Sequence, residues 1–250
     1  MNPSRPEDAS GRPTALAALD TGIVSCRACP RLVAWREDAE ARRPASFPDA
    51  PYWARPLPGF GDPLAKLLLV GLAPAAHGGN RTGRMFTGDR SGDFLFAALH
   101  RAGYANQPTS VSAQDGLALA GAYVTAAVRC APPDNRPTPV ERDSCAHFLV
   151  EELALLPQAR VFVALGQFAY EGLLRTGAAG NPSEGPRRRA RFAHRLELPL
   201  EGGRTLLCSY HPSQRNVFTG LLTAEMFDGV LARAAELGAP PPRPATVSSS

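Results

Sequence analysis

Short, continuous apolar runs alternate with longer amphipathic stretches along the middle of the chain. The apolar runs are KLLLVG from Lys66, AYVTAAV from Ala122, RVFVALG from Arg160 and TLLCSY from Thr205. Each is bounded by Gly, Pro or polar turn residues, a pattern typical of strands that are covered on both faces. We therefore expect these runs to be buried strands of one mainly parallel sheet.

The stretches between the runs have the apolar periodicity of helices. They are SGDFLFAALHRAG from Ser91, TPVERDSCAHFLVEELALL from Thr138, GQFAYEGLLRTG from Gly166 and TGLLTAEMFDGVLARAAELG from Thr219. Thr138 suits an N-cap and Pro139 the first helical position. RFAHRLELPL and GRTLLCSY, joined at residues 201–203, predict a hairpin. Strands that alternate with helices predict an α/β domain.

The composition supports a single domain. The chain has 250 residues, of which 44% are hydrophobic, and this is enough for one substantial core. We assign residues 1–14 to a flexible arm, 15–237 to one domain, and the Pro- and Ser-rich residues 238–250 to a disordered tail. No apolar run is long enough to span a membrane, and the N-terminus lacks the apolar segment of a signal peptide. We expect a cytoplasmic monomer.

The charge is mildly basic. The net charge is +4 and the pI is about 9.0, and Arg supplies the excess because Lys66 is the only lysine. The planar guanidinium suits phosphate groups, so the composition is compatible with a nucleic-acid partner. A GC-rich genome that encodes its basic residues as Arg explains the same bias equally well.

The five cysteines indicate a metal site more than a disulfide framework, because disulfides are rare in a reducing compartment. Cys26 and Cys29 form C-R-A-C, Cys130 follows the second strand, and Cys145 lies in the next helix. Four thiolates suit tetrahedral zinc or an iron–sulfur cluster, and the spacing does not choose between them. A lone CxxC is also compatible with two ordinary buried thiols. Cys208 lies mid-strand and is expected in the core.

Ligands of parallel α/β sheets bind beyond the carboxyl ends of the strands, where two loops are expected. One loop follows Gly71, and the other is HPSQRN from His211. Pro212 disfavours helix at His211 and so helps to aim its ring. His211 is therefore a better functional candidate than the other histidines outside these loops, which we expect on the surface or in packing: His100, His147 and His194.

Three residues of the first loop each allow two interpretations. His77, beside Gly78, either acts directly or bonds a backbone carbonyl as an ordinary loop histidine. Asp89 is either a charge favoured by the helix N-terminus or a carboxylate that faces the ligand. Phe86 either belongs to the core or offers a flat surface for stacking.

Four sequence features together resemble the uracil-DNA glycosylase superfamily, and within it family 5, the UDGb type. They are GLAPAAHGGNRTGRMFTGD from Gly71, AVRCAPPDNRPTP from Ala127, HPSQRN from His211 and the four cysteines. The resemblance implies a three-layer α/β/α sandwich with a central four-stranded, mainly parallel sheet. It also implies a monofunctional hydrolase of base excision repair. This enzyme would remove uracil, and other deaminated bases such as hypoxanthine and xanthine, from double-stranded DNA after base flipping.

The resemblance implies a role for particular residues. A [4Fe–4S] cluster would be held by Cys26, Cys29, Cys130 and Cys145. His211 would donate a hydrogen bond to the leaving base, and Asp89 would place water or favour the cationic sugar. Phe86 would stack on the flipped base, with further substrate contacts from Gly71, Ala73, Pro74, His77, Gly78 and Asn135. The contacts to DNA would come from Ser213, Arg215, Asn216, Arg187 and Arg188, with Arg189 and Arg191 nearby, although a solvated basic loop explains the arginine run nearly as well.

Two departures from related families predict broad specificity. Relatives often carry a carboxylate or Asn that orients water, where this chain has Leu72 and Ala75 or Ala76. They also often carry an Asn that reads the base edge, where this chain has Ala126 or Ala127. A site that lacks this amide discriminates less between bases. We also expect that no single substitution abolishes activity.

Two other functions remain possible on the sequence alone. One is a non-catalytic nucleic-acid-binding protein with a structural four-cysteine zinc site. The other is a nucleotide hydrolase that uses the Gly-rich loop, which is weak because the loop has no G-K-[ST].

Overall fold

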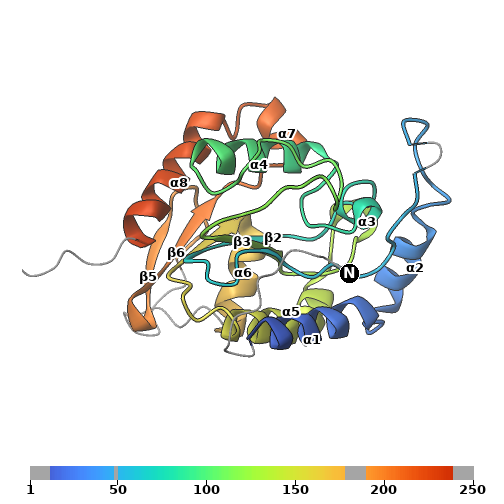
Figure 1. Cartoon of the computed structure of the whole chain (residues 1–250), viewed down its shortest axis with the longest axis horizontal. Helices are drawn as coiled ribbons and strands as arrows, with labels where there is room; N and C mark the ends of the chain where they lie inside the picture. The colour runs from blue at the N-terminus through green and yellow to red at the C-terminus, as the bar shows by residue number, and fades with distance from the viewer. Residues whose placement is uncertain (1–11, 48–49, 178–189, 239–250) are drawn as a thin grey trace, which may run out of the picture.

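A twisted sheet forms the centre of the molecule in the computed structural model, which describes residues 12–47, 50–177 and 190–238 (Figure 1). Within these residues the sheet has six strands in the order β1-β3-β2-β4-β6-β5. The four inner strands are parallel to one another, and they are β3 (Ala122–Ala126), β2 (Leu67–Gly71), β4 (Val161–Leu165) and β6 (Arg204–Ser209). The four predicted strands and their parallel arrangement are therefore confirmed.

Two antiparallel edge strands extend this sheet. The two-residue strand β1 (Phe60–Gly61) pairs with β3, and β5 (Glu197–Leu200) pairs with β6. A single 3₁₀ turn, η2 (Glu201–Gly203), joins β5 to β6, which confirms the predicted hairpin. The sheet thus has six strands where four were expected. The two further strands, β1 and β5, lie at its edges.

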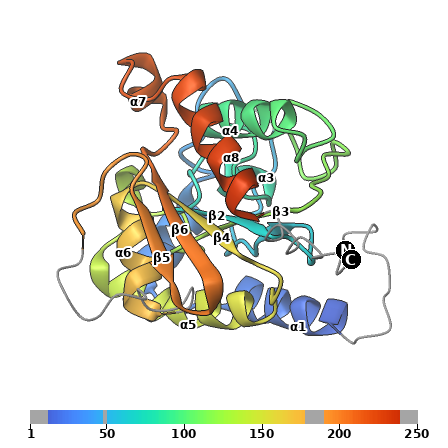
Figure 2. The ribbon, with the colours of Figure 1, turned by 90° about the vertical axis from the view of Figure 1, so that its left-hand side faces the viewer.

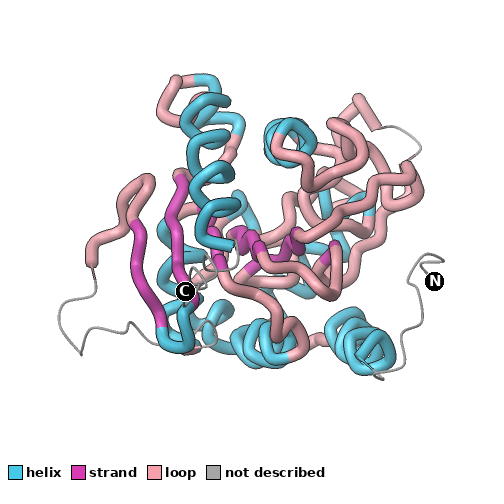
Figure 3. The backbone as a smooth tube through the Cα atoms, turned by 60° about the vertical axis from the view of Figure 1, so that its left-hand side comes forward, coloured by secondary structure: helices cyan, strands magenta, loops and turns pink. Residues whose placement is uncertain are grey.

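Helices cover both faces of the sheet, which confirms the α/β/α arrangement (Figures 1 and 2). One face carries α4 (Arg90–Arg101) and α8 (Ala224–Gly238). The other face carries α1 (Arg12–Ser25), α5 (Pro139–Ala154) and α6 (Gln167–Thr176). Figure 3 shows the strands between these two helical layers.

The alternation of side chains along each strand produces two cores. On one face, Leu69 and Val124 pack with residues of α4 and α8 such as Leu99 and Phe227. On the other face, the core contains Leu68, Val70, Phe162, Leu149, Leu153 and Leu173. Both faces of the inner strands are thus covered by apolar side chains, as their continuous apolar runs indicate.

The start of α5 agrees with the sequence prediction. Thr138 and Glu141 form a reciprocal capping box, and Pro139 occupies the first turn. The expected helix from Thr219, in contrast, is wrong at its start. A short helix, α7 (Gln214–Phe218), ends first, and Gly220 then adopts a left-handed φ of 72° before α8 begins at Ala224. The left-handed residue interrupts a periodicity that continues in the sequence.

The remaining described helices are short or lie near the N-terminus. They are α2 (Pro30–Asp38), α3 (Gly79–Thr82) and the 3₁₀ turn η1 (Pro133–Asn135). Helix α1 begins at Arg12, within the segment assigned to the flexible arm; the rest of that arm and residues 239–250 lie outside the described residues. None of the described helices combines the length and the apolar character that crossing a membrane requires.

Candidate active site

The structure brings Phe86 and His211 together at the carboxyl edge of the sheet. Strand β2 ends at Gly71 and strand β6 at Ser209, and the loops that follow carry the two side chains. The centres of the two rings are 6.2 Å apart, with 30° between their planes. This edge is where parallel sheets place their ligands.

Phe86 has an unusual backbone conformation. Its φ is 51°, in the left-handed region, which costs a residue with a side chain about 1–3 kcal/mol. Its ring lies directly over Gly71, because a Cβ at that position would be 2.6 Å from Phe86 Cζ. Gly71 therefore makes room for the ring, and the first loop and the end of β2 form one surface.

His211 is held from its backbone side, while its ring faces Phe86. Asn216 Nδ2 donates a hydrogen bond of 2.9 Å to the His211 carbonyl. Among the described residues, neither ring nitrogen has a hydrogen-bond partner, so both are free to meet a ligand. Desolvation lowers the pKa of His211 to about 4, so the ring is neutral at pH 7.

Two of the residues predicted to contact DNA shape the His211 loop. Ser213 is the N-cap of α7, and its hydroxyl accepts a hydrogen bond from the Asn216 backbone N–H. The side-chain amide of Asn216 donates to the His211 carbonyl. Arg215 is exposed. Sequence reasoning missed Phe218, at the end of α7, which is 90% exposed. The sequence carries no signal for this residue, because its exposure follows from its place at the end of α7.

The two carboxylate oxygens of Asp89 have different surroundings. Its Oδ1 accepts from Gly92 N at 3.0 Å as the N-cap of α4, which confirms the helix-start interpretation. Its Oδ2 lies against Gly78, where a Cβ would be 1.9 Å from that oxygen. Burial raises the pKa of Asp89. The second oxygen thus packs on the first loop.

The other predicted substrate residues differ in their surroundings. His77 Nδ1 lies 2.8 Å from the Tyr52 hydroxyl, a partner that neither interpretation of His77 anticipated. Pro74 is buried, and Ala73 packs against the apolar group around Cys130. Asn135 is exposed, with a left-handed φ of 55°. Arg187, Arg188 and Arg189 lie outside the described residues.

The four candidate cluster cysteines line one cavity. Cys26 follows α1, Cys29 is the N-cap of α2, Cys130 lies in the loop after β3, and Cys145 is on α5. Arg31 of α2 also makes two hydrogen bonds of 2.7 Å to Glu141 of α5, which holds the two helices together. The fold therefore brings together cysteines from segments that lie far apart in the sequence.

The donor chemistry of this cavity fits a thiolate-bound metal group. Arg36, only 2% exposed, donates from Nη1 to Cys130 Sγ at 3.1 Å, and its buried Nε has no hydrogen-bond partner among the described residues. A buried guanidinium needs nearby negative charge, and the Glu37 carboxylate, 3.8 Å from Nη2 and itself exposed, supplies only part of it. Burial raises the pKa of Cys130 to about 12 and that of Cys145 to about 11, so thiolates here need a metal.

The sulfur atoms are not gathered as the ligands of a single ion would be. In the described part of the chain, no three Cys, His, Asp or Glu side chains surround one point closely enough to hold a metal ion. Four thiolates on one zinc at about 2.3 Å would stand within ~4 Å of one another. The described side chains do not have this arrangement.

The remaining cysteine and histidines behave as expected. Cys208 is fully buried in the core beside α5 and α6. His100 and His147 are exposed, and His194 packs against Tyr210 with ring centres 5.1 Å apart.

Comparisons with known proteins identify the family to which this chain belongs. Residues 58–235 match the family model described as Uracil DNA glycosylase superfamily. A type-5 uracil-DNA glycosylase of Thermus thermophilus is 55% identical over 86% of this chain and 94% of its own length. One of Mycobacterium tuberculosis is 51% identical over 91% of this chain and 84% of its own length. A type-4 uracil-DNA glycosylase of Thermotoga maritima is only 28% identical. The chain belongs to the uracil DNA glycosylase superfamily and, within it, to the type-5 uracil-DNA glycosylases.

Proposed function

We propose that this protein hydrolyses the bond between deoxyribose and a uracil that has been flipped out of duplex DNA, as a step of base excision repair. A base inside the helix cannot be reached by a catalytic side chain and must be extruded first. The observation that carries the proposal is the pair of Phe86 and His211 at the carboxyl edge of the sheet, in a member of this superfamily.

Each member of the pair has a separate task. Phe86 stacks on the flipped base, for which its ring is already placed over Gly71. His211 donates an N–H hydrogen bond to a carbonyl oxygen of the base. As the bond from C1′ to the base nitrogen breaks, the base keeps the electron pair and this hydrogen bond stabilises its negative charge. Water then adds its hydroxyl group to C1′, and the proton that it releases neutralises the departed base.

Asp89 remains a candidate for a second task. Its Oδ2 packs beside Gly78 in the first loop, in addition to the capping role of Oδ1. When ionised, this carboxylate would place the attacking water or favour the cationic sugar. Substitution by Asn keeps the capping oxygen and removes the charge, which separates the two roles.

Position 126 supports broad base specificity. Ala126 is paired with Gly71 in the sheet and shares the core on which Phe86 packs, whereas Ala127 faces Gly172 of α6. An amide that reads the base edge would therefore have to stand at Ala126, where this chain has only a methyl group. We infer that hypoxanthine and xanthine are also substrates, because no buried amide is present at position 126 to reject them.

The DNA face is proposed to centre on α7. Arg215 is exposed there for contact with phosphate, which carries most of the affinity in such complexes. The exposed ring of Phe218 suits the space that the flipped base leaves, since apolar side chains commonly wedge between base pairs. Contacts from Arg187 and Arg188 stay a prediction.

The cysteine cavity is proposed to hold a [4Fe–4S] cluster. Each thiolate of such a cluster binds a different iron, so the cysteines surround the group instead of meeting at one point, in agreement with a shared cavity. When bound, the cluster would cross-link α1, α2 and α5 to the segment after β3. That segment reaches the first loop directly, through hydrogen bonds from Val128 N to Leu72 O and from Ala127 N to Gly71 O.

The activity is tested with duplexes that carry uracil, hypoxanthine, xanthine or thymine opposite each normal base, followed by alkaline detection of abasic sites. We expect cleavage of the uracil duplex and of both deaminated purines. His100→Ala, which removes an exposed histidine, serves as the matched control for His211→Ala and should cleave at the wild-type rate. Absence of abasic sites from every duplex would refute the glycosylase, and activity on uracil alone would refute the broad specificity.

The cofactor is tested separately. Purified protein should contain iron and acid-labile sulfide and absorb visible light, and Cys130→Ser should lose both. Cys208→Ser removes a buried cysteine outside the cavity and should keep them. Zinc in place of iron would contradict the cluster and would favour a structural four-cysteine zinc site.

A further inference from the structure

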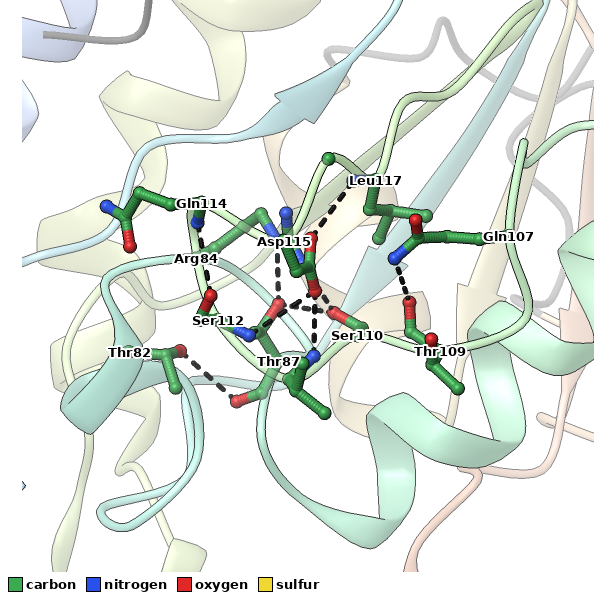
Figure 4. A network of polar contacts seen from close by, with 12 residues as sticks. Thr82, Arg84, Thr87, Gln107, Thr109, Ser110, Ser112, Gln114, Asp115 and Leu117 are labelled. Atoms are coloured by element: carbon green, nitrogen blue, oxygen red, sulfur yellow. Dashed lines mark hydrogen bonds and ion pairs between the residues drawn. The ribbon is translucent and has the colours of Figure 1, made fainter.

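Arg84 is a buried cation in the loop that carries Phe86, two residues before it in the sequence. Its side chain is 6% exposed, and Nη2 donates to Asp115 Oδ2 at 2.8 Å and to Ser110 Oγ at 2.9 Å (Figure 4). Its Nε donates to Thr87 Oγ1 at 2.9 Å. A buried ion pair of this kind contributes little net stability, because both charges lose their hydration. Loss of Arg84 would leave the Asp115 carboxylate without its charged partner, so the pair ties the Phe86 loop to the segment that carries Asp115.

Asp115 fixes the segment that grips Arg84. We call residues 110–117 the strap. Asp115 Oδ2 also accepts from Val111 N at 2.8 Å, and Oδ1 accepts from Leu117 N at 3.0 Å. Burial alone would raise the pKa of Asp115, but the hydrogen bonds from Arg84, Leu117 and Val111 lower it to about 2. The carboxylate is thus charged at pH 7, and its hydrogen bonds tie the two ends of the strap together.

The strap holds the loop on both sides of Phe86. Before Phe86 it binds Arg84. After Phe86 the Ser110 hydroxyl lies 2.7 Å from Thr87 Oγ1, and the Ser110 carbonyl accepts from Gly88 N at 2.8 Å. Figure 4 shows these side chains converging on one point.

The backbone of Phe86 is enclosed as well. A Cβ at Gly92 would be 1.9 Å from the Phe86 carbonyl oxygen, so the first turn of α4 closes over this peptide group. The left-handed φ of 51° is therefore imposed from several directions. The ring, in contrast, is only partly buried and faces Gly71 and His211.

We propose that Arg84, gripped by Asp115 and Ser110 of the strap, is a positioning residue that holds Phe86 in its left-handed conformation with the ring ready to stack on the target base. The inference rests on the proposed stacking role of Phe86. Without Arg84 the backbone relaxes toward an ordinary conformation, and the ring leaves its place over Gly71. The duplex is still bound through its phosphates, so kcat falls while KM changes little.

A double-mutant cycle on single-turnover cleavage of uracil duplex tests this inference. Phe86→Ala and Arg84→Met should each lower the rate by about a hundredfold, as expected when a positioned group is misplaced by about 1 Å. The double variant should be no slower than Phe86→Ala, because Arg84 acts only through Phe86. Arg101→Met is the matched control, since it breaks the exposed Arg101–Asp228 pair and should leave the rate unchanged.

A purely structural role for Arg84 would give a different result. Destabilisation would add to the loss from Phe86→Ala, so additive effects would overturn the inference, as would a wild-type rate for Arg84→Met. A wild-type rate for Phe86→Ala would instead refute the stacking role itself. If Arg84→Met does not fold, Ser110→Ala, which removes two hydrogen bonds and keeps the ion pair, enters the same cycle with the same expectations on a smaller scale.

Discussion

The neutrality of His211 makes the sharpest prediction about this enzyme. Desolvation lowers its pKa to about 4, so only about one ring in a thousand is protonated at pH 7. The working form is then a neutral imidazole that donates one N–H, not an imidazolium. We expect the wild-type rate of uracil release to show no inflection near pH 6.5, where an ordinary histidine titrates.

The perturbation is His211→Ala. Loss of one donor to a developing negative charge should lower kcat by about 10²–10³-fold, with affinity for the uracil duplex nearly unchanged. The assay is single-turnover cleavage from pH 5 to 9 for both proteins, with His100→Ala as the control. An inflection near pH 6.5 that is present in the wild type and absent in His211→Ala would refute the neutral ring. An unchanged rate would remove His211 from the mechanism.

The same pKa predicts how stability depends on pH. Between pH 6.5 and about 4 the unfolded chain binds a proton at His211 that the folded chain does not bind. Stability therefore falls as the pH drops through this window, by at most about 1.4 kcal/mol per pH unit for this one group. Urea unfolding should show the wild type losing stability relative to His211→Ala over this range, and parallel curves would contradict the assignment.

Three further substitutions test the rest of the site. Gly71→Ala places a Cβ 2.6 Å from Phe86 Cζ, so single-turnover cleavage should slow by about tenfold or more as the ring shifts; an unchanged rate would separate Gly71 from ring placement. Asp89→Asn should keep the cap of α4 and the melting temperature of the protein. A slower rate would then assign the charge of Asp89 to catalysis, whereas a wild-type rate would leave Asp89 only its role as a helix cap. Phe218→Ala should weaken duplex binding by about tenfold, measured by fluorescence anisotropy, without loss of stability because the ring is 90% exposed; equal affinity would refute the wedge.

Local patterns in the sequence were enough for most of the scaffold. The continuous apolar runs predicted the four parallel strands because strands buried on both faces cannot alternate. The Thr138 cap and the following Pro139 set the start of α5 through contacts within one turn. The helix from Thr219 failed where a single left-handed residue, Gly220, interrupts the periodicity. Periodicity carries no information on the φ angle of one residue.

The candidate residues were also identifiable from the sequence, but not their geometry. Motif resemblance pointed to Phe86, His211 and the four cysteines. It did not show that the two rings lie 6.2 Å apart or that one cavity unites all four cysteines. It also missed Arg84, which looks like any other arginine of a basic chain.

The physical reason is the range of the interactions involved. Strands, helix caps and turns depend on neighbours a few residues away, so the amino-acid sequence by itself determined them. The left-handed Phe86, the neutral ring of His211 and the buried Arg84 depend on desolvation and on contacts with distant segments such as the strap. Only the tertiary structure decides which groups lose water and which partners replace it.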